Sequence, residues 1–259
     1  MIHRPDPNGL IVITQPPHAL MAGQIARSWG NRQFGDIAPR AETCTAAALH
    51  DLGWLAWEVS PTLNPQTGHP HAFDQIGQAA HLEIWSRGPR LAIAFGRYVA
   101  LLVSLHGSSL FYLRSHGHKP PSAAFESFLT SQRALQKDLI ASLNADANIA
   151  RYGSGESIAR NQGVIRACDA ISLYLCMGLD RERTIPDIPS ANGSITLTLT
   201  AEKDRPTEAR LHPWPFAEPV VPLTVEGRRL PQVFSSTDEL HEALAQAPWV
   251  ALSMRLTPA

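Results

Sequence analysis

The segment Ala46-Ala-Ala-Leu-His-Asp-Leu-Gly-Trp54 carries the strongest structural signal in this chain. A helix that begins after Pro39 and is rich in small residues would deliver His50 and Asp51 just before Gly53, which favours a helix end. Neighbouring positions on a helix are about 100° apart, so the two side chains point in different directions. This arrangement suits an aspartate between two metal ions and a histidine that faces only one of them.

Helical periodicity dominates the sequence on both sides of this segment. Helices are predicted at residues 18–29, 40–51, 73–87, 90–104, 123–144 and 157–178, with Gly88-Pro89 separating the third from the fourth. After Pro186 the pattern changes to strands at 194–200, 220–225 and 250–256, with a helix at 237–245. The expected fold class is mainly α. Residues 1–190 would form a helical metal-binding domain with a short strand at 9–14, and residues 191–259 a small antiparallel α+β appendage packed on it.

Composition limits the classes of partner and the compartment. The formal net charge of the 259-residue chain is −1 and 17% of residues are charged, so no electrostatic footprint for nucleic acid or an anionic membrane is visible. The three cysteines lack the spacing of a disulfide framework or an all-thiolate zinc site. The first residues do not form a signal peptide. We therefore expect a cytoplasmic protein that acts on a small molecule, and a homodimer stays open.

Further metal-ligand side chains flank the His50-Asp51 pair in an ordered series. His18 precedes the pair, and His81, His106 and Asp169 follow it. Imidazole and carboxylate together suit divalent iron, manganese, zinc or nickel, with one or two ions per chain. An aspartate in the middle of an apolar helix, as at Asp169, is costly unless it is paired or metal-bound. The competing histidines, His69, His71, His116 and His118, are interpreted as loop or surface residues.

This order of ligands resembles the HD-domain superfamily of metal-dependent phosphohydrolases and their di-iron oxygenase relatives. The resemblance covers roughly residues 18–178 and implies an HD-domain-like helical bundle. In the superfamily pattern, the matching residues at His18, His50, Asp51 and Asp169 would hold one metal, and those at Asp51, His81 and His106 a second. Asp51 would then bridge the two ions.

A narrower resemblance covers nearly the whole chain. The motifs His18-Ala-Leu-Met-Ala-Gly, His50-Asp-Leu-Gly-Trp, Leu102-Val-Ser-Leu-His-Gly and His212-Pro-Trp-Pro-Phe are similar to those of an uncharacterised bacterial family, domain of unknown function 3891. That resemblance implies no established activity. The function must therefore be argued from the residues themselves.

Two features depart from the superfamily pattern. Many HD hydrolases place Lys, His or Arg where this chain has Trp54, so phosphate binding loses a usual helper, and Glu58 is the nearest replacement acid or base. The second feature is geometric. A simple helical hairpin that turned at Gly88-Pro89 would put His81 about 10 Å and His106 about 25 Å from the turn. The helices must cross obliquely, or the break must lie elsewhere.

Three functions remain open on this reasoning. The leading hypothesis is a metal-dependent hydrolase of a phosphate ester or nucleotide, in which the metals activate water, Asp51 and Glu58 are the catalytic residues, and arginines such as Arg27, Arg97 or Arg160 bind phosphate. The first alternative is an HD-type di-iron oxygenase, to which Trp54 is a weaker objection. The second alternative is a non-catalytic metal-binding or regulatory module.

Overall fold

The computed structural model describes residues 1–115, 122–202, 205 and 207–259. His116 and His118, which the sequence places on the surface, lie outside these residues. Within them, no helix is long and apolar enough to cross a membrane.

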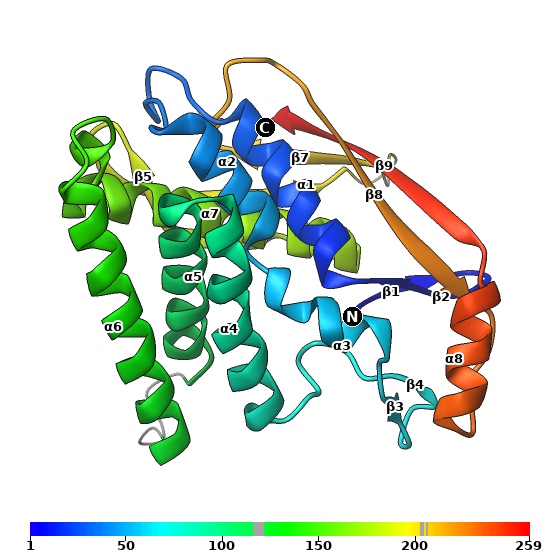
Figure 1. The fold of residues 1–259 in the computed structure, drawn as a ribbon. Coiled ribbons are helices and arrows are strands. Elements are labelled where there is room, and N and C mark those ends of the chain that lie inside the picture. The colour runs from blue at the N-terminus through cyan, green and yellow to red at the C-terminus, as the bar shows by residue number, and fades with distance from the viewer. Residues whose placement is uncertain (116–121, 203–204, 206) are drawn as a thin grey trace.

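The helices form one layer of the molecule and supply most of the candidate ligands. They are α1 (Gln15–Ser28), α2 (Arg40–Leu49), η1 (Leu52–Trp54), α3 (Leu55–Val59), α4 (Gln78–Ala92), η2 (Ile93–Phe95), α5 (Arg97–Ser115), α6 (Ala123–Asn144), η3 (Ala150–Tyr152), α7 (Gly155–Met177) and α8 (Thr237–Gln246). In Figure 1, α4, α5 and α6 stand beside one another, while α1 and α7 lie closer to the sheet. Helices were predicted near each α-helix except α3, so the helical layer follows the periodicity of the sequence.

A seven-stranded mixed sheet forms the other layer. Its strands are β1 (Ile2–Asp6), β2 (Gly9–Ile13), β5 (Arg183–Ser190), β6 (Gly193–Ala201), β7 (Glu208–His212), β8 (Val221–Leu230) and β9 (Trp249–Pro258), and they lie in the order β1-β2-β8-β9-β7-β6-β5. All neighbours are antiparallel except β7 and β9, which are parallel. A short separate hairpin consists of β3 (Leu63–Asn64) and β4 (His69–Pro70).

The expected fold class, a mainly α HD-like bundle with a small antiparallel appendage, is therefore wrong. The sheet is large, and it takes strands from both sides of the expected boundary at residue 190, which falls in the turn between β5 and β6. One hydrophobic core joins the two layers: Ile11 of β2, Leu197 of β6 and Leu223 of β8 belong to the same buried cluster as Met21 of α1 and Ile171 of α7.

Two of the missed strands, β1 and β5, lack the alternation that reveals a half-buried strand, whereas β7 (Glu-Ala-Arg-Leu-His) alternates over only five residues. β1 reads Ile-His-Arg-Pro-Asp, with one apolar side chain other than proline, and β5 contains two prolines. Proline removes a ladder donor, so prolines indicate an edge strand or none at all. β1 and β5 are in fact the two edges of the sheet. Pairing of β2 with β8 joins residues more than 200 positions apart, which local periodicity does not reveal.

The predicted helix break at Gly88-Pro89 is also wrong, because α4 continues through it to Ala92 and the chain turns at Gly96, where φ is 118°. The close packing at this point depends on Gly53. A Cβ on Gly53 would lie 2.1 Å from the carbonyl oxygen of Ile84, whereas a Cβ on Gly88 would lie 3.4 Å from the nitrogen of Gly53, an ordinary van der Waals contact. Gly53 thus lets the segment after Asp51 lie directly against α4.

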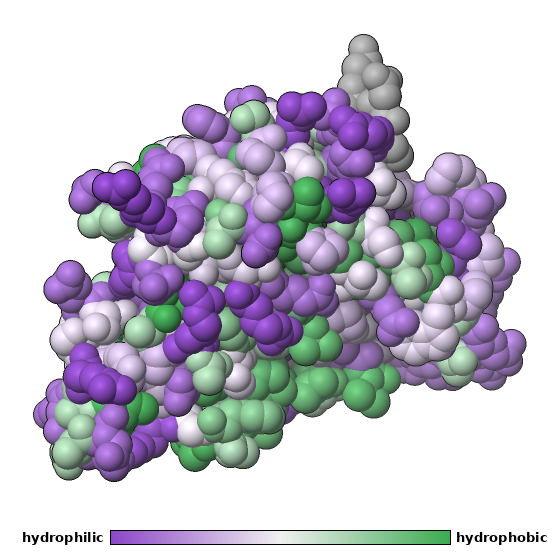
Figure 2. All heavy atoms as spheres, turned by 90° about the horizontal axis from the view of Figure 1, so that it is seen from above, coloured by the Kyte–Doolittle hydropathy of each residue, from purple (hydrophilic) through white to green (hydrophobic). Residues whose placement is uncertain are grey.

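The surface carries scattered apolar side chains. Leu20 of α1, Val59 of α3 and Trp249 of β9 are 51%, 84% and 64% exposed. Figure 2 shows the upper face, where hydrophilic side chains predominate and hydrophobic ones gather toward its lower edge. None of these three residues lines the candidate site described next.

Candidate metal centre

Four separate segments bring metal-ligand side chains together in the helical layer. His18 comes from α1, His50 and Asp51 from the end of α2, His106 from α5 and Asp169 from α7. The histidines are 1%, 5% and 2% exposed in that order, and Asp51 is 8% exposed. Helices α1 and α2 approach each other closely at Gly23, which has no side chain. A Cβ at this position would lie only 2.6 Å from the Cβ of Ala48. Small residues therefore position His18 beside His50.

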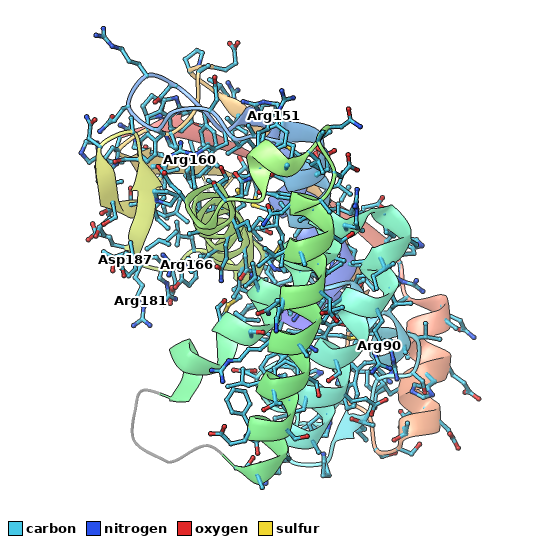
Figure 3. The ribbon with its side chains drawn as sticks, turned by 60° about the vertical axis from the view of Figure 1, so that its left-hand side comes forward. Arg90, Arg151, Arg160, Arg166, Arg181 and Asp187 are labelled. Carbon is cyan, nitrogen blue, oxygen red and sulfur yellow. The ribbon has the colours of Figure 1, made fainter. Side chains whose placement is uncertain are left out.

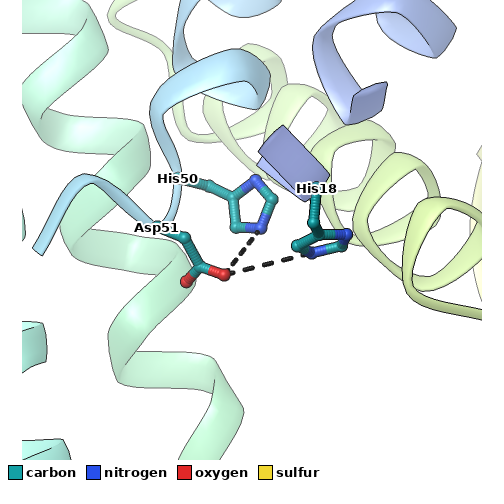
Figure 4. A group of neighbouring side chains, drawn as sticks. All are labelled: His18, His50 and Asp51. Carbon is teal, nitrogen blue, oxygen red and sulfur yellow. Dashed lines mark ion pairs between the residues drawn. The ribbon is translucent and has the colours of Figure 1, made fainter. Parts of the chain in front are cut away.

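Three of the four distances between donor atoms match those between neighbouring ligands of a single ion. Nε2 of His18 lies 3.0 Å from Oδ1 of Asp169 and 3.9 Å from Oδ2 of Asp51. Nε2 of His50 is 3.4 Å from both Oδ2 of Asp51 and Oδ1 of Asp169. Ligands at about 2.1 Å from an ion are about 3.0 Å apart at right angles and about 3.4 Å apart in a tetrahedron. Figure 4 shows three of these side chains converging on one point.

Hydrogen bonds on the far side of each ring fix the two histidines. Ser172 Oγ donates to the carbonyl oxygen of His18 at 2.7 Å, so its contact of 2.6 Å with Nδ1 requires that Nδ1 donates. Nδ1 of His50 donates to the carbonyl oxygen of Ala47 at 2.8 Å. In each neutral ring the lone pair then lies on Nε2, the atom that faces the carboxylates. Lone pairs that face carboxylate oxygens call for a cation between them.

The pKa values of His50 and Asp169 also indicate that the two carboxylates require positive charge beside them. Burial by itself lowers the pKa of His50, but the carboxylates of Asp51 and Asp169 outweigh it and raise that pKa well above its usual value. Burial opposes ionisation of Asp169, yet the charge of His50 outweighs it and holds the pKa of Asp169 well below its usual range. A proton on His50 thus supplies, without metal, part of the positive charge that the carboxylates require.

His106 joins this group rather than a separate one. Its Nε2 lies 3.5 Å from Oδ2 of Asp169, and its ring centre lies 4.7 Å from that of His50. Neither ring nitrogen of His106 has a hydrogen-bond partner although both are buried. Burial, followed by the charge of His50, lowers the pKa of His106 to about 4. It is therefore a neutral imidazole with lone-pair capacity, as a metal ligand must be.

His81 lies in the same cavity but at its far wall. Its Nε2 donates to the carbonyl oxygen of Phe73 at 2.8 Å, and its ring packs between Trp54 and Trp85 at centroid distances of 5.7 and 5.1 Å. It is not part of the groups of mutually close ligand atoms. Five of the six expected ligands thus fall into two groups of mutually close atoms that share His50, namely His18-His50-Asp51 and His50-His106-Asp169. The sixth, His81, stands apart and lines the cavity with His18, Asp51, His106 and Asp169.

Glu58 is placed outside the group. Its Oε1 accepts from the backbone nitrogen of Gln15 at 3.0 Å and lies 3.1 Å from the amino group of Met1. Burial raises the pKa of the Glu58 carboxyl, and the amino group opposes that effect. Its observed contacts hold the start of α1, so the structure gives it a positioning role for the residues before His18.

The arginines suggested for phosphate binding are also elsewhere. Arg160 donates to the carbonyl oxygens of Phe34, Asp36 and Ser190, and Arg97 donates to Ser142 and Asp146. Figure 3 shows Arg160 and Arg166 extending from α7 on the side of Asp187 and β5. The cavity beside the ligands has a volume of about 140 Å³ and is lined by Gln15, His18, Asp51, Trp54, Phe73, His81, Trp85, His106, Leu110, Asp169 and Leu173. No arginine or lysine is among these described residues.

Sequence reasoning missed two residues that shape this site. Ser172 fixes the ring of His18, and Gln15 lines the cavity. Ser172 lies three residues after Asp169, on neighbouring positions of one helix, so that spacing was an available signal. Gln15 is the first residue of α1 and has no motif around it. Its location depends on how α1 packs against the rest of the site.

Comparison with protein-family models identifies the family. Residues 1–232 match the model of a protein family of unknown function, DUF3891. The chain belongs to this family. Comparison with curated proteins and with solved structures finds no match. Membership of DUF3891 agrees with the narrower resemblance of the motifs and assigns no activity, so a function has to be proposed from the site.

Proposed function

We propose that this member of DUF3891 is a metal-dependent hydrolase whose metal is held by His18, His50, Asp51, His106 and Asp169. The observation that carries the proposal is that Nε2 of His50 and both ring nitrogens of His106 are buried without a hydrogen-bond partner, beside the carboxylates of Asp51 and Asp169. Histidine nitrogens and carboxylate oxygens together would hold a divalent ion such as iron, manganese, nickel or zinc, which would serve to activate water. The ligand pattern of HD hydrolases supports the same reading, although the fold of this chain is different.

The residues around the ligands would serve the reaction in three ways. A bound divalent cation would lower the pKa of a coordinated water and so supply a nucleophile near neutral pH. Ser172 and the carbonyl oxygen of Ala47 hold the rings of His18 and His50 in place. Trp54, Trp85 and Leu173 form apolar walls that exclude bulk water from the cavity.

Charge balance links the number of metals to the substrate. Two carboxylates, Asp51 and Asp169, balance one divalent cation, and the described cavity lining has no arginine or lysine to balance a phosphate dianion. A second divalent cation, near His81, would leave a net charge of +2 and would make the site fit for a phosphate ester. A single cation would make it fit for an uncharged ester or amide. Metal stoichiometry therefore predicts substrate class.

The second candidate is a di-iron oxygenase, and the apolar walls of the cavity favour it. Trp54, Phe73, Trp85, Leu110 and Leu173 suit a hydrocarbon group better than a phosphate. Protein loaded anaerobically with iron should then consume oxygen and give a mixed-valence signal in electron paramagnetic resonance. Two irons per chain without either property would rule this candidate out.

The experiment that tests the hydrolase combines elemental analysis with activity. Protein purified without chelators, and protein reconstituted with Mn²⁺, Fe²⁺, Ni²⁺ or Zn²⁺, is assayed on phosphate esters and on uncharged esters and amides. We expect at least one metal per chain and metal-dependent hydrolysis that is lost in His50→Gln and kept in His212→Gln, a substitution of an exposed histidine. Full metal occupancy without hydrolysis of either class would contradict the hydrolase and favour a non-catalytic module.

A further inference from the structure

A second cavity lies between α7 and the hairpin of β5 and β6. Its volume is about 470 Å³, against about 140 Å³ for the cavity beside the metal ligands, and the two share no lining residue among those described. Helix and strand touch closely at Gly163, where a Cβ would lie 2.7 Å from Cδ of Pro189. Small-molecule sites commonly have volumes of roughly 300–1,000 Å³, so this α7–β5 cavity is large enough for a ligand.

Arg166 of α7 lines this cavity and is held by the backbone of β5. Its Nη2 donates to the carbonyl oxygens of Pro186 and Asp187. The two carbonyls belong to a bulge, because the register of β5 with β6 shifts between Ile185 and Ile188, and Asp187 has a φ of 57°. A positive φ at a residue other than glycine costs free energy, and such conformations cluster at functional sites. The bulge therefore fixes the guanidinium of Arg166 at one wall of the cavity.

Arg166 keeps an accessible donor and has no acidic partner. Its Nη1 makes no hydrogen bond within the described part of the chain and, unlike Nε, is not among the buried atoms without a partner, so a ligand can reach it. No ion pair joins Arg166 to a described carboxylate. Arg160 lines the same cavity and likewise donates to carbonyl oxygens. A fixed, accessible and unpaired guanidinium suits a carboxylate, with which it forms a charge-assisted hydrogen bond.

Two carboxylates line the same cavity without pairing with the arginines. They belong to Glu156 of α7 and Asp187 of β5, and neither side chain has a hydrogen bond or ion pair with another described residue. Figure 3 shows Asp187 on the same side of α7 as Arg160 and Arg166. The formal charges of the two carboxylates and the two guanidiniums cancel, so net charge favours neither an anion nor a cation. A ligand that carries both charges complements this lining.

We propose that the α7–β5 cavity binds a zwitterion of the amino-acid or short-peptide type. The carboxylate of the ligand accepts from Nη1 of Arg166, and its ammonium group pairs with Glu156 or Asp187. The site is distinct from the metal centre, since none of the five converging ligands lines it. It adds a binding function that does not depend on hydrolysis.

The test uses four dipeptide derivatives of nearly the same shape. Alanyl-alanine carries both charges, N-acetyl-alanyl-alanine only the carboxylate, alanyl-alaninamide only the ammonium group, and N-acetyl-alanyl-alaninamide neither. Their affinities are measured by ligand-observed NMR titration on the full metal-free chain. We expect alanyl-alanine to bind about three- to tenfold more tightly than either singly charged compound, a modest gain because the charged groups of the cavity are partly solvated.

Substitutions in the cavity assign each preference to its residue. In Arg166→Met, alanyl-alanine and alanyl-alaninamide should bind equally, whereas Arg181→Met, the same change at an exposed arginine outside the cavity, should keep the preference. In the double variant Glu156→Gln and Asp187→Asn, the difference between alanyl-alanine and N-acetyl-alanyl-alanine should disappear, because both carboxylates that face the ammonium group have lost their charge.

The wild-type titrations alone can overturn the inference. Equal affinities for the four compounds would do so, as would the lack of binding by any of them at about 10 mM. A preference for the free carboxylate that survives in Arg166→Met would also contradict it, because another group would then hold the carboxylate. Metal content of Arg166→Met should equal that of the wild type, so this test is independent of whether the metal centre hydrolyses a substrate.

Discussion

Helix α7 carries two charged residues, Arg160 and Asp169, that lie half a turn apart around the helix axis. The charges of these two side chains have different kinds of partner. Arg160 donates hydrogen bonds to the backbone carbonyl oxygens of Phe34, Asp36 and Ser190, so its guanidinium group is already hydrogen-bonded within the chain. Asp169 faces the Nε2 atoms of His18, His50 and His106, so the positive charge that it requires has to come from a proton on His50 or from a cation. Their separation of nine positions corresponds to a rotation of about 900°, or half a turn beyond two full turns.

The difference separates a structural use of charge from a functional one. A guanidinium surrounded by carbonyl oxygens is complete and adds stability to the fold. A carboxylate that faces imidazole nitrogens requires a proton on one of them or a cation between them. Changes at Arg160 should therefore lower stability and spare metal binding, whereas changes at Asp169 should lower metal binding. The predictions below test that division.

The largest effect is expected from Asp169→Asn. This substitution removes the charge that faces all three histidines, and we expect metal affinity to fall by at least about 1,000-fold, beyond the 10–100-fold typical of outer-shell partners. The metal-free variant should be less stable than the metal-free wild type at pH 7, because the lowered pKa of Asp169 means that its charge stabilises the folded state beside His50. Chelator competition and urea unfolding measure the two quantities. Retained affinity would place the metal elsewhere.

We expect acid to destabilise the metal-free protein through His106 of α5, whose ring faces Asp169 of α7. His106 has a pKa of about 4 in the folded state and about 6.5 when unfolded, so it takes up a proton on unfolding. Its contribution is complete above pH 6.5 and is lost as the pH falls toward 4, a change of about 3 kcal/mol. His50, whose pKa is raised, contributes fully below its unfolded pKa and does not cause this loss.

The variant His106→Gln isolates that contribution. Urea unfolding at several pH values between 7 and 4 should show a flatter fall in the free energy of unfolding than in the wild type, and His212→Gln, at an exposed histidine, should match the wild type. Equal slopes in all three proteins would show that His106 is already protonated or solvated when folded. Arg160 makes no such contribution, because a guanidinium does not titrate in this range.

Arg160→Met tests the other side of the comparison. Three backbone carbonyls lose a charged donor, and because the arginine is partly exposed we expect a loss of about 2 kcal/mol and a fall in Tm of about 4–8 °C. Metal affinity should stay within about twofold of the wild type. Calorimetry and chelator competition provide the readouts, and Arg181→Met, at an exposed arginine, is the control. A large loss of metal affinity would mean that α7 cannot hold Asp169 without Arg160.

Asp169 and Arg160 also show which contacts of the candidate site can be predicted from the sequence and which cannot. Asp169 stood out because an acidic residue inside an apolar helical run needs a partner, and the order of His18, His50 and Asp51 suggested one; the structure brings all four together. Arg160 looked like a phosphate ligand because residue type alone does not reveal three carbonyl acceptors from segments 34–36 and 190. Contacts of that kind are decided by tertiary packing, which local patterns do not encode.

The same limit applies to the fold and to Gln15. Helices were found because their periodicity is local, and strands 194–200 and 250–256 because they alternate, so β6 and β9 are confirmed. The proline-bearing edge strands and the pairing of β2 with β8 were not found, and the sheet was underestimated. Gln15 has an unsatisfied acceptor only because α1 buries it beside the ligands. An unmet hydrogen bond is a property of the folded chain.

The smallest effect is expected from Ser172→Ala, which sharpens the comparison within one face of α7. Ser172 does not belong to the ligand group, but it accepts from Nδ1 of His18 and so keeps the Nε2 lone pair toward Asp169. Its loss should lower metal affinity about tenfold, the lower end for an outer-shell partner, with the stoichiometry of bound metal unchanged. Competition titration against a chelator measures the shift. An affinity equal to that of the wild type would show that packing alone orients His18, and that the hydroxyl group merely satisfies the backbone carbonyl of that residue.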